Sequence, residues 1–137
     1  MEWPETVDQL VRAQRALAKE RPALCRPPGS GLSFGGCFVC FPRGKEGTGA
    51  AGDAASAAAA LIGPEGAVAT AVASGIAGAG YRAGLLALRE GPLLEAAVRS
   101  LNQVSDVLLV NATGRDHPRG AGLAPIWEPC SVFPRWA

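Results

Sequence analysis

Two stretches of the chain decide its fold: YRAGLLALREGP at residues 81–92 and DVLLVNATGRDHPRGAGL at residues 106–123. The second stretch opens with an apolar run at residues 107–110, which is typical of a strand buried on both faces. A glycine-rich loop follows this run and carries most of the polar groups, namely Asn111, Arg115, Asp116, His117 and Arg119. Because α/β proteins place functional groups where a buried strand ends in a polar loop, this segment is the first candidate for a site.

The residues between the two stretches predict a helix over residues 92–103. Pro92 stands where an N1 proline belongs, and apolar residues follow at helical spacing. Glu90 comes just before this helix, in an Arg-Glu-Gly-Pro corner, and residues 75–84 form a glycine-rich loop ahead of it. The sequence therefore places an acid at the junction of a flexible loop and a helix.

Upstream, a capping box beginning at Thr6 and an amphipathic pattern predict a helix over residues 6–21, limited by Pro22 and followed by a linker at 25–31. Residues 32–41 predict a short strand. Two alanine-rich runs, 55–62 and 67–74, flank a Gly-Pro-Glu-Gly turn and predict a hairpin. This order of elements predicts an α/β fold, a mixed sheet in which a three-strand antiparallel meander joins a parallel strand and helices flank the sheet.

The composition suits one domain. The chain has 137 residues and a net charge of +1, so no global field marks it as a nucleic-acid binder. The N-terminal residues lack the basic and apolar regions of a signal peptide, and charged residues, proline and glycine interrupt the alanine-rich stretch 50–80. We therefore expect a cytoplasmic protein with no membrane partner, and nothing in the sequence indicates an obligate protein partner.

A C-x-x-C pair, Cys37 and Cys40, lies inside the strand predicted at 32–41. Residues three apart on a strand point to opposite faces, which places the two thiols badly for one metal ion or one disulfide. The sequence has one histidine and no second C-x-x-C to complete a zinc site. The pair is therefore interpreted as structural.

Motifs in order along residues 35–124 resemble the endonuclease V family, nucleases that incise nucleic acid near deaminated purines. The motifs are GGCFVCF (35–41), GYRAG (80–84), LREGP (88–92), VNA (110–112), GRDHPR (114–119) and GLA (122–124). The resemblance implies a ribonuclease H-like fold, Mg²⁺ or Mn²⁺ as cofactor, and DNA or RNA as partner. It also implies a function of the DNA-repair type, cleavage of a phosphodiester near deoxyinosine.

The resemblance also implies roles for single residues. Glu90 resembles the glutamate of the family's metal site, His117 the histidine near the scissile phosphate, and Tyr81 the tyrosine of the loop that opens the duplex. A nucleic-acid-binding set follows from the same motifs: Tyr81, Arg82, Gly84, Arg115 and Arg119. Three further cations in neighbouring segments, Arg43, Lys45 and Arg89, are predicted to add to a phosphate-holding surface.

The chain departs from the family pattern at two acids. Phe38 and Asn111 stand where the family has aspartates, so Glu90 and the amide of Asn111 are the remaining candidates for metal binding, with Asp116 as another nearby acid. A magnesium site for cleavage needs anionic oxygens. Three interpretations stay open: an endonuclease with impaired activity, a catalytically inactive nucleic-acid-binding pseudoenzyme, and a non-functional fragment.

The C-terminal residues PIWEPCSVFPRWA (125–137) do not continue the family pattern. Codons for these residues can be chosen so that reading from the third base of the Pro125 codon yields HLGAVLGVPTVG, which resembles the family's continuation. The sequence therefore predicts a partial domain over residues 1–124, incomplete at its C-terminus, and a tail at 125–137 that is read out of frame.

Overall fold

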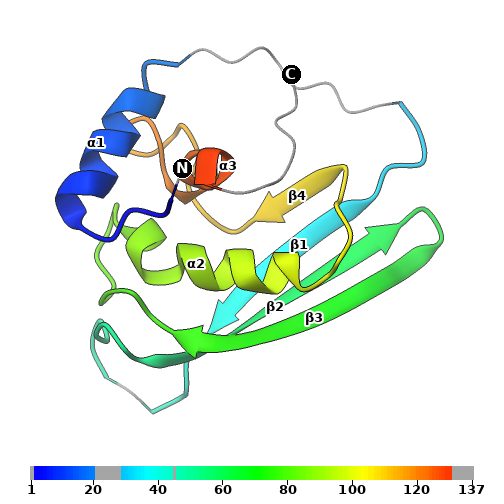
Figure 1. Cartoon of the computed structure of the whole chain (residues 1–137), viewed down its shortest axis with the longest axis horizontal. Coiled ribbons are helices and arrows are strands. Elements are labelled where there is room, and N and C mark those ends of the chain that lie inside the picture. The colour runs from blue at the N-terminus through cyan, green and yellow to red at the C-terminus, as the bar shows by residue number, and fades with distance from the viewer. Residues whose placement is uncertain (1, 21–28, 45, 131–137) are drawn as a thin grey trace.

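The computed structural model describes residues 2–20, 29–44 and 46–130. Its elements follow the order α1 (Val7–Leu17), β1 (Phe34–Cys40), β2 (Ala54–Gly63), β3 (Gly66–Ile76), α2 (Leu86–Arg99), β4 (Val107–Val110) and α3 (Leu123–Cys130). The four strands form one sheet, and the three helices lie on one side of it (Figure 1). The predicted α/β architecture with a mixed sheet is confirmed.

The strand order is β3-β2-β1-β4, in which β1, β2 and β3 form an antiparallel meander and β4 runs parallel to β1. The hairpin of β2 and β3 closes at the predicted turn, with Gly66 at a φ of +120°, a value that favours glycine. Phe34 pairs with Val107 and Cys37 with Val110. Because the two strands are parallel, β1 and β4 run toward the same end of the sheet.

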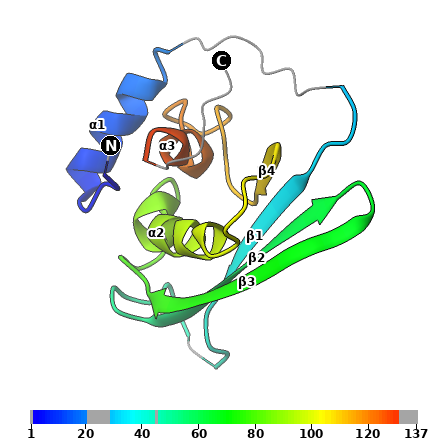
Figure 2. The ribbon, with the colours of Figure 1, turned by 45° about the vertical axis from the view of Figure 1, so that its right-hand side comes forward.

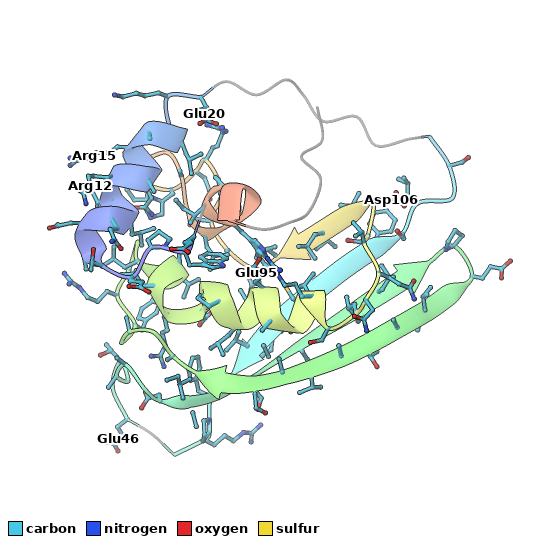
Figure 3. The ribbon with its side chains drawn as sticks, in the orientation of Figure 1. Arg12, Arg15, Glu20, Glu46, Glu95 and Asp106 are labelled. Atoms are coloured by element: carbon cyan, nitrogen blue, oxygen red, sulfur yellow. The ribbon has the colours of Figure 1, made fainter. Side chains whose placement is uncertain are left out.

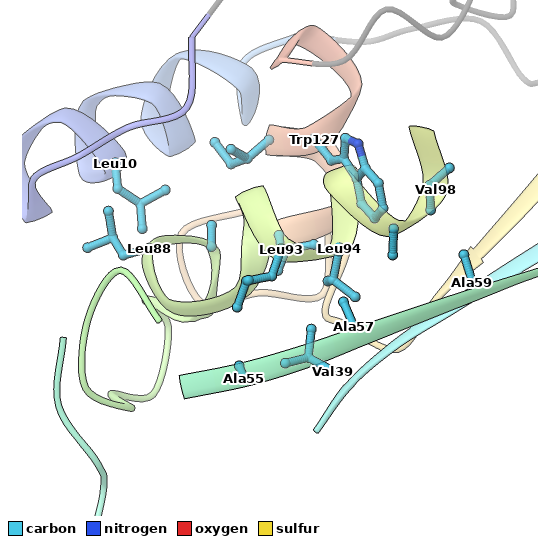
Figure 4. Packing of buried hydrophobic residues seen from close by; sticks show 14 of the residues in the cluster. Leu10, Val39, Ala55, Ala57, Ala59, Leu88, Leu93, Leu94, Val98 and Trp127 are labelled. Atoms are coloured by element: carbon cyan, nitrogen blue, oxygen red, sulfur yellow. The ribbon is translucent and has the colours of Figure 1, made fainter. Parts of the chain in front are cut away.

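The core lies between the sheet and α2 (Figure 4). Alternate residues of β2 point inward, and they are small near α2, with Ala57 fully buried. Leucines of α2 fill the space above them, and a Cβ added at Gly75 would stand 2.6 Å from Leu93 Cδ2. Because the packing is this close, we expect truncation of Leu94 to alanine to cost about 2–5 kcal/mol of unfolding free energy.

The N-terminal segment and α3 cover the far side of α2. Thr6 caps α1 through the predicted box, since its Oγ1 accepts from the Gln9 N–H at 3.2 Å. The α1 helix ends at Leu17, earlier than predicted, while Pro22 and most of the predicted linker lie outside the described residues. In α3, Ile126 and Trp127 are buried, and the Trp127 ring lies 6.3 Å from that of Trp3.

The boundary predicted after Ala124 falls inside α3, so the first residues of the predicted tail pack on the core. The buried Nε1 of Trp127 has no hydrogen-bond partner in the part of the chain that the structure describes. Buried N–H groups are normally paired, so this indole is poorly matched to its surroundings. The out-of-frame reading of 125–137 stays a prediction, and sequencing the gene beyond codon 125 tests it.

Two expectations about local structure are wrong. Pro92 is inside α2 and not at its start, because the helix begins at Leu86. The proline removes the N–H that would bond to the Leu88 carbonyl, and the loop residue Gly78 packs there, donating its own N–H to the Arg89 carbonyl at 3.3 Å. The strand at 107–110 is also not buried on both faces, since Leu109 is 62% exposed and β4 lies at the edge of the described sheet.

The start of β4 is tied to the start of β1 by a reciprocal pair of hydrogen bonds. The Asp106 carboxylate accepts from the N–H and the hydroxyl of Ser33, each at 2.8 Å, and the Asp106 N–H donates to Ser33 Oγ at 3.0 Å. Figure 3 shows Asp106 at this end of the strand. The hydrogen bonds from Ser33 lower the pKa of Asp106 and help to fix the parallel register.

Cys37 and Cys40 are both free thiols, and the interpretation of the pair as structural stays a prediction. Burial raises the pKa of Cys37 to about 11, which keeps it protonated near neutral pH. Within residues 2–20, 29–44 and 46–130, no helix has the length and apolar character needed to cross a membrane.

Candidate functional site

Glu90 is the centre of the candidate site. It lies in the second turn of α2, half-buried, and it lines two neighbouring pockets of about 370 and 310 Å³. No hydrogen bond to its carboxylate is present among the described residues. Burial raises the pKa of Glu90, and the positive charge of Arg89 lowers it in part. The structure therefore presents an accessible acid without a hydrogen-bond partner, which is the state expected of a group that meets a ligand.

The smaller pocket gathers the positions for which the resemblance implies metal-binding acids. It is lined by Cys37, Phe38, Val39, Leu86, Glu90, Leu94 and Asn111. Because Cys37 pairs with Val110 in the parallel ladder, the next residues along the two strands, Phe38 within β1 and Asn111 just after β4, are neighbours. The structure thus brings Glu90, Asn111 and Phe38 together, as the motifs imply.

The donors in this pocket do not fit a magnesium or manganese ion. Glu90 supplies one carboxylate, Asn111 supplies a neutral amide oxygen, and Phe38 supplies no ligand atom. The thiol of Cys37 stays protonated because its pKa is raised to about 11. The described residues contain no group of three or more His, Cys, Asp or Glu side chains placed to hold a metal ion. Hard divalent cations need several anionic oxygens, so we derive no catalytic step that depends on a metal ion in this pocket.

The larger pocket is also lined by Glu90. Its lining includes Phe41, Thr48, Asp53, Tyr81 and Arg89. The Tyr81 side chain is half-exposed. The backbone N–H of Tyr81 donates to the Thr48 carbonyl at 2.7 Å, which ties the predicted duplex-opening loop to the loop after β1. The aromatic ring therefore stands at the rim of a pocket that also contains Glu90.

Arg89 supports this pocket from inside the protein. Its Nη1 donates to the Ala79 carbonyl at 2.6 Å. Its guanidinium carbon lies 3.9 Å from the centre of the Phe41 ring, and its Nη2 lies 3.7 Å from Asp53 Oδ2. Only 8% of the Arg89 side chain is exposed. These contacts hold Arg89 within the protein at the lining of the larger pocket, and its part in a phosphate-holding surface stays a prediction.

His117 lies in a separate, closed cluster. Its Nδ1 accepts from the Arg119 N–H at 3.0 Å, and its Nε2 is 3.2 Å from the Gly84 carbonyl. We assign the proton to Nε2, since the carbonyl can only accept. The same carbonyl accepts from Arg119 Nη2 at 2.5 Å and from Gln14 Nε2 at 3.3 Å, while Arg119 Nε donates to Gln14 Oε1 at 2.6 Å.

These bonds join three parts of the chain: α1 through Gln14, the loop before α2 through Gly84, and the loop after β4. His117 is buried and lines neither pocket at Glu90. Gly84 has a φ of +78°, which favours glycine, and a Cβ there would stand 3.1 Å from His117 Nε2 and from Arg119 Nη2. In this structure His117, Gly84 and Arg119 hold the loop in place.

The remaining predicted residues lie on the surface. Arg82, Arg43 and Arg115 are exposed, and Arg115 Nη1 donates to the Leu17 carbonyl at the end of α1, at 3.4 Å. Asp116 is exposed and accepts from the Gly114 N–H at 2.7 Å, which stabilises the local turn. Lys45 lies outside the described residues.

Two residues of the site were not identified from the sequence. Gln14 is 1% exposed and stands on the buried face of α1 with Leu10 and Leu17. Its signal in the sequence was its position, as a polar residue on the apolar face of the predicted helix. Asp53 comes just before β2 and accepts from the Ala50 N–H at 2.8 Å. Nothing in its local sequence distinguishes it from a turn aspartate.

The model of the endonuclease V family matches residues 41–127 of this chain. Among solved structures, endonuclease V from Streptomyces avermitilis has a TM-score of 0.76 at 29% identity, over 96% of this chain and 56% of that one. The catalytic domain of human endonuclease V has a TM-score of 0.72 at 26% identity, over 95% and 56%. No curated protein sequence matches significantly.

A third structure is endonuclease V of Ciona intestinalis in complex with a 24mer DNA that contains an inosine followed by a ribo-adenosine. It has a TM-score of 0.67 at 18% identity, over 88% of this chain and 52% of that one. The chain therefore spans about half the length of the structures it matches. These likenesses confirm the ribonuclease H-like fold predicted from the motifs.

Proposed function

Because this chain belongs to the endonuclease V family, we propose that it binds nucleic acid across the Glu90 cleft and does not cleave it by metal-dependent hydrolysis. One observation carries this proposal. The pocket that brings together the family's acid positions holds Glu90 beside Asn111 and Phe38, and not a set of carboxylates. A single carboxylate supports far less metal binding than shared carboxylates do.

Binding needs a surface for phosphates and a group that interacts with bases. The exposed side chain of Arg82 follows Tyr81 in the loop before α2, and Arg43 is exposed in the loop after β1. Arginine donors position a nucleic-acid backbone, and an exposed aromatic ring can stack on an unpaired base. Tyr81 has this exposure and lines the pocket beside Glu90.

We take DNA or RNA with a deaminated base as the proposed ligand, and damage recognition of the DNA-repair type as the role. The Ciona protein was crystallised with inosine-containing DNA, which supports this choice of ligand. An unpaired or mismatched base leaves the stack at the lowest cost, so an inosine site suits a protein that inserts an aromatic ring.

A second candidate function is a metal-dependent endonuclease of low activity. It is favoured by the accessible, unpaired state of Glu90, which keeps the family's position on α2. The two functions differ in what happens to the bound strand, so one pair of measurements separates them.

The experiment measures binding and cleavage of the same probe by the full chain. A fluorescent oligonucleotide with one deoxyinosine is titrated without metal, and then incubated with Mn²⁺ and resolved on a denaturing gel. We expect binding without cleavage, and an affinity loss of about tenfold in Tyr81→Ala from the missing stacking. The matched control Val104→Ala removes an exposed side chain elsewhere and should keep the affinity.

Two results would overturn the proposal. Equal affinity of Tyr81→Ala and the unsubstituted chain would show that the loop before α2 does not contact the probe. Mn²⁺-dependent cleavage that Glu90→Gln abolishes would establish the endonuclease instead.

A further inference from the structure

Two loops that are far apart in the sequence line the larger pocket together. One is the segment 47–53, between β1 and β2, and the other is the segment 77–84, between β3 and α2. Figure 2 shows the connection from β1 to β2 beside the end of β3. The Gly52 N–H donates to the Ala77 carbonyl, and the Ala77 N–H donates to the Asp53 carbonyl, each at 2.8 Å. These bonds join the two segments where the β2-β3 ladder ends.

The two segments pack closely on each other and on the side chains beneath them. A Cβ added at Gly80 would stand 2.7 Å from the carbonyl oxygen of Gly49. Gly49 has a φ of +70°, and a Cβ there would stand 2.5 Å from Asp53 Oδ2 and 2.8 Å from Arg89 Nη2. The backbone at Gly49 therefore lies directly against the Asp53 carboxylate and the Arg89 guanidinium, an approach that only glycine allows.

Asp53 is the residue that joins these contacts. Its Oδ2 accepts from the Ala50 N–H at 2.8 Å and lies 3.7 Å from Arg89 Nη2, with 14% of the Asp53 side chain and 8% of the Arg89 side chain exposed. Arg89 in turn donates to the Ala79 carbonyl at 2.6 Å. One carboxylate thus fixes the turn of its own segment through Ala50 and connects that segment, through Arg89, to the segment that carries Tyr81.

Tyr81 is attached to this arrangement by its backbone. Its N–H donates to the Thr48 carbonyl at 2.7 Å, while its side chain is half-exposed. Thr48 comes two residues before Ala50, whose N–H is bonded to Asp53. A side chain that is already held in place loses less conformational freedom on binding than one on a free loop. The contacts of Asp53 therefore bear on the affinity for a base that stacks on Tyr81.

We propose that Asp53 is a positioning residue of the nucleic-acid-binding site, and that it holds the segment 47–53 in the shape that keeps Tyr81 at the rim of the larger pocket. This inference rests on the proposed function, in which Tyr81 stacks on a base. The charge of Asp53 by itself repels a phosphate backbone, so removing it through electrostatics alone would strengthen binding. Loss of the positioning contacts weakens binding, and the two effects have opposite signs.

The first measurement needs no nucleic acid. Tyr81 is the only tyrosine of the chain, so production of the full chain with fluorotyrosine labels this one position. We expect the fluorine NMR line of Asp53→Ala to move from its place in the unsubstituted chain toward its place in the urea-unfolded chain. Glu65→Ala is the matched control, because it removes one exposed carboxylate in the turn between β2 and β3. It should leave the line unmoved.

The second measurement is the affinity for the deoxyinosine oligonucleotide, titrated without metal. We expect Asp53→Ala to bind about tenfold more weakly than the unsubstituted chain, because the Tyr81 ring must then be ordered on binding. Glu65→Ala, which removes the same charge, should bind as well or more tightly. Asp53→Ala combined with Tyr81→Ala should bind no more weakly than Tyr81→Ala alone, since Asp53 acts through Tyr81.

Circular dichroism and urea denaturation check that each variant is folded. If Asp53→Ala is not folded, Asp53→Asn replaces it, since its amide oxygen keeps an acceptor for the Ala50 N–H, and the same changes are expected at smaller size. An unmoved fluorine line would overturn the inference, as would tighter binding by Asp53→Ala. A moved line with no effect of Tyr81→Ala on affinity would support the action of Asp53 on Tyr81 and overturn the proposed function instead.

Discussion

The surroundings of Glu90 and of His117 are opposite in kind, although both residues belong to motifs of the same family. Glu90 is half-buried, has no hydrogen bond to its carboxylate among the described residues and opens onto two pockets. His117 is buried, and both of its ring nitrogens are engaged within the protein. The carboxylate of Glu90 is open to the pockets, whereas the ring of His117 is engaged within the protein.

This difference teaches that a motif match identifies a position, while hydrogen-bond satisfaction indicates what the residue does there. The Gly84 carbonyl already receives donors from Gln14, His117 and Arg119. Around Glu90, in contrast, the two positions for which the motifs imply acids are occupied by Asn111 and Phe38, and both line the same pocket as Glu90. The following substitutions test the two assignments separately.

The largest effect is expected from restoring the acids beside Glu90. Phe38→Asp combined with Asn111→Asp should produce Mn²⁺-dependent cleavage of a deoxyinosine oligonucleotide, at least about 100-fold faster than in the unsubstituted chain, because a metal ion can then stabilise the charge that develops on the phosphate. A denaturing gel under single-turnover conditions measures the rate. Adding Glu90→Gln should remove the gain. Equal cleavage by the unsubstituted chain would show that the existing donors suffice.

The next effect is expected at the cluster around His117. Arg119→Ala removes the donors to the Gly84 carbonyl and to the amide oxygen of buried Gln14, and we expect a loss of about 2 kcal/mol in unfolding free energy. Urea denaturation measures this loss. Arg82→Ala is the matched control, since its exposed side chain should change stability by less than about 0.5 kcal/mol. If the two variants were equally stable, the cluster would not hold the loop.

The smallest effect is expected from neutralising Glu90. Its pKa is raised by burial, so the folded state binds a proton more readily than the unfolded state, and this carboxyl reduces stability as the pH rises through its raised pKa. Glu90→Gln should therefore melt at a slightly higher temperature at neutral pH. The difference should vanish below the ordinary pKa of a glutamate.

Thermal melts followed by circular dichroism between about pH 4 and pH 8 measure this dependence. Glu95→Gln serves as a contrasting variant, because Glu95 accepts from Trp3 Nε1 and from Arg99, and its neutralisation should destabilise the fold (Figure 3). A Glu90→Gln variant that melts below the unsubstituted chain at neutral pH would indicate a partner for this acid that stabilises its charge.

Much of the fold could be predicted because its signals are local. The capping box at Thr6 and the turn at residues 63–66 act within a few residues, and the order of elements then limited the sheet to a meander with one parallel strand. Pro92 shows the limit of this reasoning. A proline at a helix start and one inside a helix have the same local sequence, and only the distant contact with Gly78 shows which applies.

The candidate site also has a part that the sequence predicts and a part that it does not. Motif spacing placed Glu90, Asn111 and Phe38 together, because neighbouring strands and the helix above them follow from the fold. The bonds of His117 and Arg119 could not be found in this way, since Gln14 is 70 residues before Gly84 and 105 before Arg119. Exposure of β4 depends on which elements cover it, and a four-residue apolar run carries no information about that.

The position of α3 has a consequence for folding during synthesis on the ribosome. Ile126 and Trp127 are among its most buried side chains, and α3 packs on both α1 and α2. The sheet and its first helices are synthesised well before these two residues leave the exit tunnel. We therefore expect the nascent chain to stay without a closed core, and open to chaperones and proteases, until residue 127 has left the exit tunnel.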